Sequence, residues 1–298
     1  MAQDVELAQL RVLVVLAEEL HFGKAAKRLR VAQPALSQQI ARLEARLKFR
    51  VFDRTSRRVT LTEAGTSFLE RVRGILSEID GAVRTGREIA SGQIGTVRVG
   101  YIATAMLTVL PRIVREFRAS HPRVRIELRE MSSAPQIESL VKGELDVAIT
   151  TGSSDHDTLL CFEAWRDPLV AVVPKNSPIP RSKSTSPKSL AGNPLIIFPR
   201  AQAPAFYDQV MKLCRDSGFD PIIDQEAQSW HMIAQLVSSE MGVAIAPESI
   251  QRYRVSGVRY IRLRPAGTVS TTICCQRDGT NPAAKLFVDI ARRLTPEL

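Results

Sequence analysis

The first fifty residues contain three short segments with helical spacing of apolar residues, and this succession constrains the fold more than any other feature. The segments run from Glu6 to Glu19, from Lys24 to Leu29 and from Pro34 to about Leu47. Proline suits the start of the last segment, because a residue in the first turn of a helix needs no backbone N–H. Two short helices joined by the tight turn at 31–33 predict a helix-turn-helix.

The side chains near the start of the third segment suit contact with DNA. Amides pair with adenine, and hydroxyls can either donate or accept at a base edge. We therefore expect this helix to lie in a major groove and to read bases. The residues of this helix that we assign to DNA binding are Gln33, Pro34, Ser37, Gln38 and Arg42.

Residues 50–62 have the pattern of a wing, with two short strands around a basic turn. Arg54, Arg57 and Arg58 are placed there for the DNA backbone or the minor groove. Between residues 21 and 60, eleven Lys and Arg minus two acids give +9, in a chain whose net charge is +10. Such a field favours a polyanion, although a solvated basic face that aids solubility would show the same charge.

A longer helical segment extends from Thr62 to about Ala90. A small domain cannot bury its apolar stripe alone, so we expect a partner helix and hence a dimer. Two recognition helices in a dimer match a two-fold operator. The stripe consists of Phe68, Leu69, Val72, Ile75, Leu76, Ile79 and Val83.

Beyond a hinge-like segment at 91–95, the chain alternates strand-like and helix-like stretches. This alternation predicts β-α-β units and a parallel sheet with helices on both faces, and it occurs twice, so we expect two α/β lobes. The predicted domains are 1–62 for a winged helix-turn-helix that is otherwise all-α, 63–91 for a linker and dimerisation helix, and 92–298 for the α/β part, with lobe I at about 96–165 and 268–298 and lobe II at about 166–267.

Several kinds of chemistry have no motif in this sequence. It contains no G-x-S-x-G, H-E-x-x-H or Walker A pattern, so we expect neither an enzyme nor a cofactor. The cysteines form no C-x-x-C pair and have no nearby His cluster with zinc-ligand spacing, so we expect no metal. We interpret all four as packing residues and not as a disulfide framework; they are Cys161, Cys214, Cys274 and Cys275.

No apolar run approaches the ~18 residues that a membrane span needs, and the N-terminus lacks the order of a signal peptide. We therefore expect a cytoplasmic protein with no membrane partner. A free solute-binding protein is the alternative that shares the two-lobed part, but it would carry an export signal and would lack the DNA module.

Residues spread over the whole N-terminal module follow a known pattern without a gap. They are Leu10, Leu13, Ala17–Glu19, His21–Phe22, Ala25–Ala26, Leu29, Val31, Gln33–Ser37, Gln39–Ile40, Leu43–Glu44, Leu47, Phe52, Arg54 and Leu61–Gly65. The module strongly resembles the LysR-type transcriptional regulators. This resemblance implies a linker helix followed by two Rossmann-like lobes similar to a type 2 periplasmic binding protein.

The resemblance also implies partners and roles. Family members form a homotetramer, usually a dimer of dimers, that bends double-stranded promoter DNA, contacts RNA polymerase and binds a small-molecule inducer between the lobes. It assigns base reading to the start of the third helix and the wing contact to Arg54. Ala32 stands where the family usually has Ser, which removes a phosphate or cap contact. Gln38 stands where many members have Arg, which shifts the expected base preference from guanine toward adenine.

The C-terminal part resembles the subgroup that controls aromatic and chloroaromatic breakdown, the regulators of catechol, benzoate and muconate pathways. The residues that carry this resemblance are Leu110–Pro111, His121–Pro122, Ile126–Leu128, Phe198–Arg200, Pro204, Phe206 and Gly242–Pro247. The resemblance implies an inducer-responsive activator of a catabolic operon, with a small aromatic or dicarboxylic acid as inducer. A non-aromatic metabolite, or redox control through a cysteine, is the alternative within the family.

The effector positions follow from the resemblance and have a physical basis. Crevices form after strand ends in open α/β sheets, and a helix start offers N–H groups to a carboxylate. Thr104 and Ser133 could instead cap helices, and Phe206 could be a core residue. Thr151 and Gln228–Ser229 stand where some members have Arg and an Arg-Glu pair, which argues against a second, buried effector site. The assigned residues are Thr104, Ser133, Arg200 as a local cation, Pro204, Ala205, Phe206 and Trp230.

Overall fold

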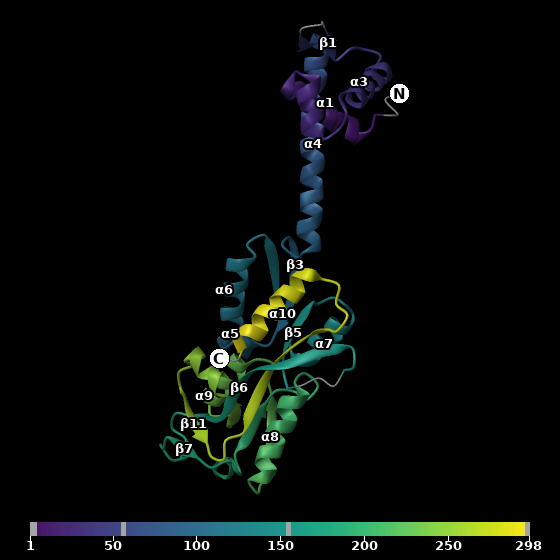
Figure 1. Ribbon diagram of the computed structural model, residues 1–298. Helices are drawn as coiled ribbons and strands as arrows, with labels where there is room; N and C mark the ends of the chain where they lie inside the picture. Colours follow the sequence, from purple (N-terminus) through teal and green to yellow (C-terminus); the bar gives the residue numbers. More distant parts are fainter. Residues whose placement is uncertain (1–4, 55–57, 153–155, 296–298) are drawn as a thin grey trace. The chain divides into compact units, whose positions relative to one another are not determined.

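A computed structural model describes residues 5–54, 58–152 and 156–295. The chain divides into two compact units, one up to Arg87 and the other from Glu88 onward (Figure 1). Each unit has its own hydrophobic cores.

The first unit is a three-helix module with a hairpin. Its elements are α1 (Leu7–Glu19), α2 (Phe22–Leu29), α3 (Gln33–Leu47), β1 (Phe52–Arg54) and β2 (Val59–Leu61). The two strands pair antiparallel, with Phe52 opposite Leu61. Leu13 of α1 and both Leu36 and Ile40 of α3 are almost fully buried in one cluster, because their helical spacing puts them on one face.

The long helix α4 (Glu63–Ala90) begins against the hairpin. The Thr62 hydroxyl accepts the Gly65 N–H at 2.8 Å and donates to the Arg50 carbonyl at 2.8 Å. A Cβ atom on Gly65 would lie 2.1 Å from the Val51 carbonyl oxygen, so only glycine fits this close approach. From residue 73 to residue 90, all described, no side chain is buried. A single chain therefore leaves the outer part of the apolar stripe uncovered.

The second unit is built on an eight-stranded mixed sheet in the order β4-β3-β5-β12-β6-β11-β7, with β10 also on β6. A two-stranded parallel sheet, β8 with β9, joins it through a bridge between Leu195 and Val243. The strands are β3 (Gly95–Tyr101), β4 (Val124–Glu130), β5 (Val147–Thr151), β6 (Leu159–Pro174), β7 (Ser184–Thr185), β8 (Pro194–Ile197), β9 (Ile222–Glu226), β10 (Ala244–Pro247), β11 (Val258–Leu263) and β12 (Thr268–Gln276).

The sheet is only partly parallel, contrary to the expectation from the β-α-β pattern. Strand β3 is parallel to β4 and β5, but β12 runs antiparallel to both β5 and β6. Strand β6 is long, and only its Leu169–Val173 part has the apolar run of a buried strand. Its first part pairs with β12 and its last part with β10 and β11. We call the part around β3, β4 and β5 lobe I and the part around β8, β9 and β10 lobe II.

The helices cover both faces of lobe I. Val147 and Ile149 of β5 pack in the cluster that includes α6 and α10, whereas Ala148 packs in the cluster that includes Leu140 of α7. This alternation is the two-residue period of a strand. The helical spacing of apolar residues that ends at Ser120 corresponds to α6 alone, and a separate short helix, α5, precedes it. The helices are α5 (Ala103–Leu107), α6 (Leu110–Ser120), α7 (Ser133–Val141), α8 (Pro204–Asp216), α9 (Trp230–Ser238) and α10 (Pro282–Leu294), with 3₁₀ turns at Pro187–Leu190 and Glu248–Tyr253.

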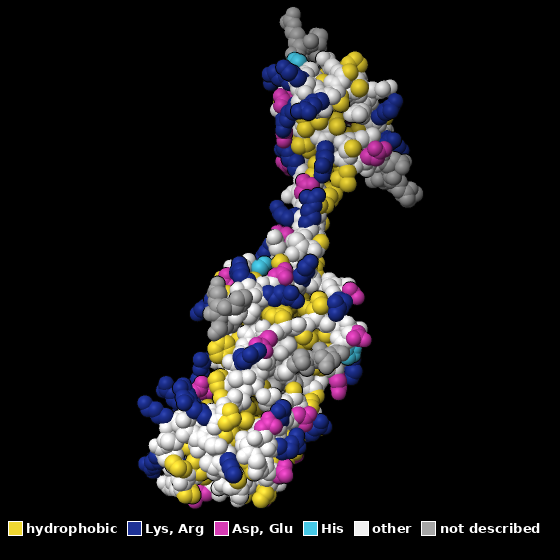
Figure 2. Space-filling view, turned by 60° about the horizontal axis from the view of Figure 1, so that its bottom comes forward, with side chains coloured by type: hydrophobic (Ala, Val, Ile, Leu, Met, Phe, Trp, Pro, Cys, Tyr) yellow, Lys and Arg dark blue, Asp and Glu magenta, His cyan; other side chains and the backbone are white. Residues whose placement is uncertain are grey.

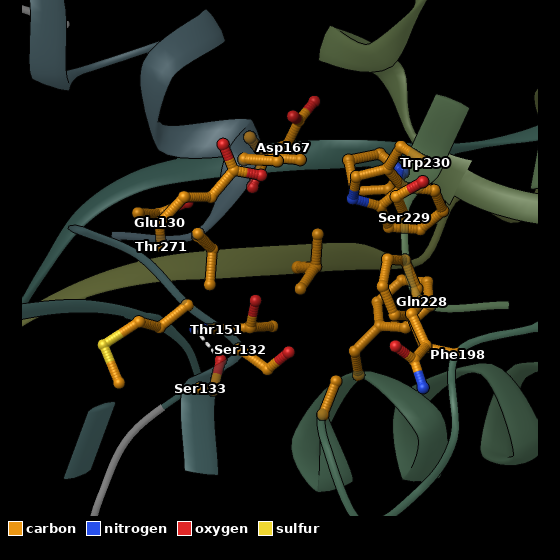
Figure 3. A pocket seen from close by; sticks show the side chains of 18 residues that line it. Glu130, Ser132, Ser133, Thr151, Asp167, Phe198, Gln228, Ser229, Trp230 and Thr271 are labelled. Atoms are coloured by element: carbon orange, nitrogen blue, oxygen red, sulfur yellow. Dashed lines mark hydrogen bonds between the residues drawn. The ribbon is translucent and has the colours of Figure 1, made fainter. Parts of the chain in front are cut away.

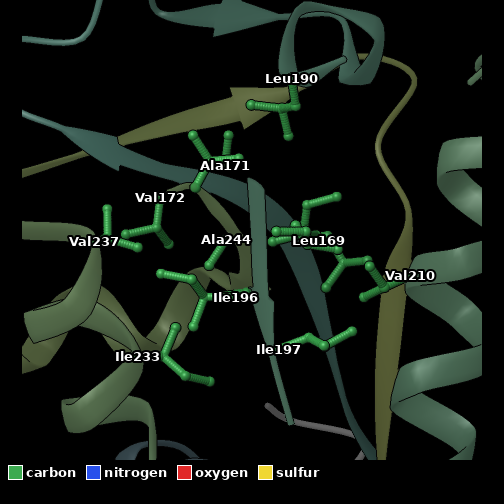
Figure 4. Packing of buried hydrophobic residues seen from close by; sticks show 14 of the residues in the cluster. Leu169, Ala171, Val172, Leu190, Ile196, Ile197, Val210, Ile233, Val237 and Ala244 are labelled. Carbon is green, nitrogen blue, oxygen red and sulfur yellow. The ribbon is translucent and has the colours of Figure 1, made fainter. Parts of the chain in front are cut away.

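Lobe II has the largest hydrophobic cluster, shown in Figure 4. Ile196 of β8, Ala244 of β10 and Val210 of α8 belong to this cluster, as do Ile233 and Val237 of α9. This core holds the first turns of α8 and α9 in place, and both turns border the site described below.

The structure contradicts the interpretation of all four cysteines as packing residues. Cys161 of β6 and Cys274 of β12 are register partners and form a disulfide, with Cα atoms 4.1 Å apart. They are 113 residues apart in the chain, so only the strand register brings them together. Cys214 and Cys275 are free, and burial raises the pKa of the Cys214 thiol to about 11. The packing interpretation was therefore wrong for the first pair.

Candidate functional site

The start of α3 presents polar side chains to solvent. Gln33, Pro34, Gln38 and Arg42 are exposed and Ser37 is partly exposed, while the apolar positions of the same helix face the core. Ala32 occupies the N-cap position and makes no side-chain cap bond. Figure 2 shows Lys and Arg side chains over the visible face of this module. The combination of an exposed polar helix start and a basic surface fits a DNA duplex.

The wing is tied to α3 by one carboxylate. Glu44 Oε1 accepts the N–H groups of Val51 and Phe52 at 2.9 and 3.0 Å, and Oε2 pairs with the Arg54 guanidinium at 2.8 Å. The same guanidinium lies 4.9 Å from the centroid of the Phe22 ring. Arg54 therefore has partners within the module, although its side chain remains 36% exposed.

Of the other two assigned wing residues, the structure describes one. Arg58 is exposed just before β2. Arg57 lies outside the described residues. The sequence did not indicate that the wing arginine would be held from α3.

A cavity of about 190 Å³ lies between the lobes. Four of the seven assigned effector residues line it, namely Thr104, Ser133, Phe206 and Trp230. The other three, Arg200, Pro204 and Ala205, are exposed and do not line it.

Arg200 is engaged elsewhere. Its guanidinium forms a two-point ion pair with Asp208 of α8, at 2.8 and 3.0 Å, and its side chain is 63% exposed. The expected local cation therefore belongs to a surface ion pair. Ala205 borders a different hollow, beside Gly152.

The hydroxyls of Thr104 and Ser133 are not helix caps. The N-cap residues of α5 and α7 are Ile102 and Ser132, and neither makes a side-chain cap bond. Ser133 Oγ instead accepts the N–H of Thr151 at 3.0 Å, a bond drawn in Figure 3. Phe206 proves to be both core and cavity wall, because it is only 3% exposed and still lines the cavity.

A buried glutamine positions the first turn of α7. Gln136 is fully buried; its Nε2 donates to the Met131 carbonyl at 2.8 Å and its Oε1 accepts the Ile149 N–H at 2.9 Å. Across the cavity rim, the Ser132 hydroxyl lies 3.4 Å from Gln202 Oε1 of lobe II. These contacts fix the segment that carries Ser133.

One wall of the cavity is aromatic. The ring of Trp230 meets Phe198 and Phe206 edge to face, with centroids 4.8 and 5.2 Å apart (Figure 3). Such a wall offers a flat apolar surface to a ligand. The sequence analysis did not assign Phe198 to the site, although it directly follows strand β8. Thr104 and Ser133 were assigned because they too follow strand ends.

Several lining residues were not expected from the sequence. Glu130 ends β4, and Asp167 and Thr271 come from β6 and β12. Asp167 is 4% exposed, burial raises its pKa, and the Ser249 N–H donates to it at 3.3 Å. The positions noted for lacking arginine, Thr151 and Gln228–Ser229, also line this cavity. No group of His, Cys, Asp and Glu among the described residues could hold a metal ion.

Two family profiles cover most of the chain. The "Bacterial regulatory helix-turn-helix protein, lysR family" profile matches residues 7–66, and the "LysR substrate binding domain" profile matches residues 90–296. The chain belongs to the LysR family of transcriptional regulators. The members of this family are transcription regulators and not enzymes, and the chain is a DNA-binding regulator of that kind.

Curated LysR-type relatives match over nearly their whole length. The regulator AlsR of Bacillus subtilis is 36% identical over 288 residues, 96% of this chain and 95% of AlsR. CatR of Pseudomonas putida is 34% identical, with 92% of this chain and 94% of CatR covered.

A solved structure of the LysR regulator CbnR has the same fold. It is 27% identical, with a TM-score of 0.80 over 97% of this chain and all of CbnR. Full-length CbnR in complex with its target DNA matches with a TM-score of 0.78. No helix in the described part of this LysR protein combines the length and apolar character that a bilayer crossing requires.

Proposed function

We propose that this LysR protein activates a catabolic operon when a small organic acid, aromatic or dicarboxylic, binds in the cavity between the lobes. The observation that carries the proposal is the convergence of three helix starts on that cavity. The N-cap residues of α7, α8 and α9, which are Ser132, Ala203 and Ser229, all line it. The Ser229 hydroxyl already accepts the Met232 N–H of α9, but the positive end of each helix dipole favours a carboxylate there. The aromatic wall would pack on a ring.

A thermal-shift screen tests the ligand. Benzoate, salicylate and cis,cis-muconate would be added to the full-length protein, because a ligand that binds the folded state raises the melting temperature. We expect at least one acid to raise it and Ser133→Ala to reduce that shift. Ser139→Ala, on the same helix outside the cavity, is the control. A shift with unrelated metabolites but with no acid would refute the proposal.

We further propose a homotetramer, a dimer of dimers, that binds double-stranded promoter DNA and contacts RNA polymerase. The uncovered stripe of α4 supports the dimer, since Ile75 and Val83 are 47% and 49% exposed in one chain. Because the target would be promoter DNA, we expect the protein to act in the cytoplasm. Light scattering should give four chains for the native protein and fewer for Ile75→Glu, while Ser77→Glu should leave the mass unchanged.

The proposed base contacts can be tested without a known promoter. Selection from a pool of random duplexes should yield a two-fold site, and Gln38→Ala should relax the preference at one position in each half-site. Arg42→Gln should weaken binding to all sequences and reduce its salt dependence. An unchanged site with Gln38→Ala would refute the role of that residue.

Redox control is a second candidate function, favoured by the Cys161–Cys274 disulfide. Cys161 borders the hollow beside Gly152, so a small thiol has a route to it. DNA affinity would be measured in reduced and oxidised glutathione, with Cys161→Ser as the comparison. Equal affinity in both buffers would remove this candidate.

A further inference from the structure

The cavity contains acidic side chains but no basic one. Of the described residues that line it, none is Lys, Arg or His, while Glu130 and Asp167 both do. The one arginine expected nearby, Arg200, is paired with Asp208 on the surface of α8. A ligand with a second carboxylate would therefore meet like charge at the acidic residues.

The carboxylate of Asp167 is buried and has no positively charged partner among the described residues. Its side chain is 4% exposed, both of its oxygens lie 3.3 Å from the Ser249 backbone nitrogen, and no ion pair links it to a Lys, Arg or His among the described residues. Burial raises the pKa of this carboxyl, and the hydrogen bonds from Ser249 and Glu248 offset that rise only in part. An ammonium group in the cavity would supply that counter-charge.

The hydroxyl groups point to a polar ligand independently. Thr104 and Thr271 are 6% and 4% exposed and line the cavity, yet neither hydroxyl has a hydrogen-bond partner among the described residues. Neither oxygen is among the buried, unpartnered side-chain atoms of the described residues, so both hydroxyls are accessible and can bond to polar atoms of a ligand.

The two kinds of polar group occupy different sides of the cavity. Figure 3 shows the carboxylates of Glu130 and Asp167 apart from the group formed by Ser132, Ser133 and Thr151. The ring of Trp230 lies on the same upper side of this view as Asp167, and an indole face also attracts a cation. The start of α7, with the hydroxyls of Ser132 and Ser133, therefore lies apart from the two carboxylates, whereas Ser229 at the start of α9 lies beside Trp230 on the upper side of this view.

We propose that the inducer is an amino acid or a compound of that class, with a carboxylate at the helix starts and a primary ammonium group at Glu130 and Asp167. This inference rests on the proposed function, because it concerns the same cavity. It narrows that proposal by removing dicarboxylates. The amine and the acid must be on one molecule small enough for about 190 Å³.

Matched ligand sets test the inference with the full-length protein. Calorimetry would compare L-phenylalanine with 3-phenylpropanoate and 2-phenylethylamine, L-leucine with 4-methylpentanoate and isoamylamine, and 4-aminobenzoate with benzoate; cis,cis-muconate represents the diacids. We expect a compound with both groups to bind about 10- to 100-fold more tightly than its amine-free counterpart, the range for a hydrogen-bonded charged group. Glu130→Gln and Asp167→Asn should abolish this ratio. Glu138→Gln, an equal charge change outside the cavity, should preserve it.

The outcomes separate this inference from the proposed function. Equal or tighter binding of the amine-free acids, or of muconate, would overturn the inference and leave the acid-responsive regulator standing. Binding of amines alone would overturn the proposed acid, and binding of none of these compounds would overturn both. If Asp167→Asn lowers the melting temperature without ligand, Glu130→Gln alone carries the comparison, because that side chain is exposed.

Discussion

Replacement of Glu44 by alanine should detach the wing from α3. The carboxylate accepts two backbone N–H groups, from Val51 and Phe52, and pairs with Arg54. Each N–H left without an acceptor costs about 1–3 kcal/mol, and the two lie in a partly buried place, so the loss should be about 2–4 kcal/mol. The ion pair adds little, because Arg54 is 36% exposed and pairs of this kind contribute about 0–1 kcal/mol.

Comparison with Glu44→Gln separates the two contributions. Glutamine keeps an oxygen for the two N–H groups and removes only the charge, so its loss should be below about 1 kcal/mol. The free energy of unfolding would be measured by urea titration with far-UV circular dichroism, and Glu70→Ala, exposed on α4, is the control. DNA binding should weaken for alanine and persist for glutamine. If both variants lost the same free energy of unfolding, the two N–H hydrogen bonds would not be the main contribution of Glu44 to stability.

Three further predictions follow from contacts elsewhere in the chain. Gly65→Ala should destabilise the first unit by about 1–3 kcal/mol, because its Cβ would lie 2.1 Å from a backbone oxygen. Gly74→Ala is the control: it has open space around it and should stabilise the helix by up to about 1 kcal/mol. Equal changes in melting temperature for the two variants would contradict the predicted clash at Gly65. Reduction of the disulfide opens a 113-residue link and should cost the second unit about 2–5 kcal/mol, whereas Cys161→Ser should not respond to reductant in the same denaturation assay. Burial alone would raise the pKa of Asp146, but hydrogen bonds from Arg98 outweigh burial and hold the pKa below 3.8. The resulting stabilisation is present above pH 3.8 and is lost as the pH falls through the lowered pKa. The melting temperature of Asp146→Asn should therefore depend less on pH than that of the native protein below about pH 4.

The helical module was predictable because its signals are local. The apolar spacing places α1 to α3 within two residues of their observed starts, and the basic composition of residues 21–60 needs no tertiary information. Strand β6 was harder. The part that pairs with β12, from Leu159 to Pro168, mixes Glu163 and Arg166 with apolar residues, and β12 comes from the far end of the sequence. The antiparallel return of β12 had no local signature either.

The cavity was only partly predictable for a related reason. Thr104, Ser133, Phe206 and Trp230 follow strand ends or begin helices, which are positions that a β-α-β pattern reveals. Asp167 comes from the middle of a long strand, where nothing in the local pattern marks a cavity.

The sequence by itself therefore determined a helix-turn-helix with a basic surface, a long helix with an unshared apolar stripe, and two α/β lobes. Periodicity and charge along the chain suffice for these, because they depend on residues that are neighbours in sequence. The tertiary structure alone decided that Arg54 pairs with Glu44, that Cys161 meets Cys274, and that the described residues lining the cavity include acids but no base. Each of these depends on which strands and helix ends meet across long separations, 82 residues for Asp167 and Ser249 and 113 for the disulfide.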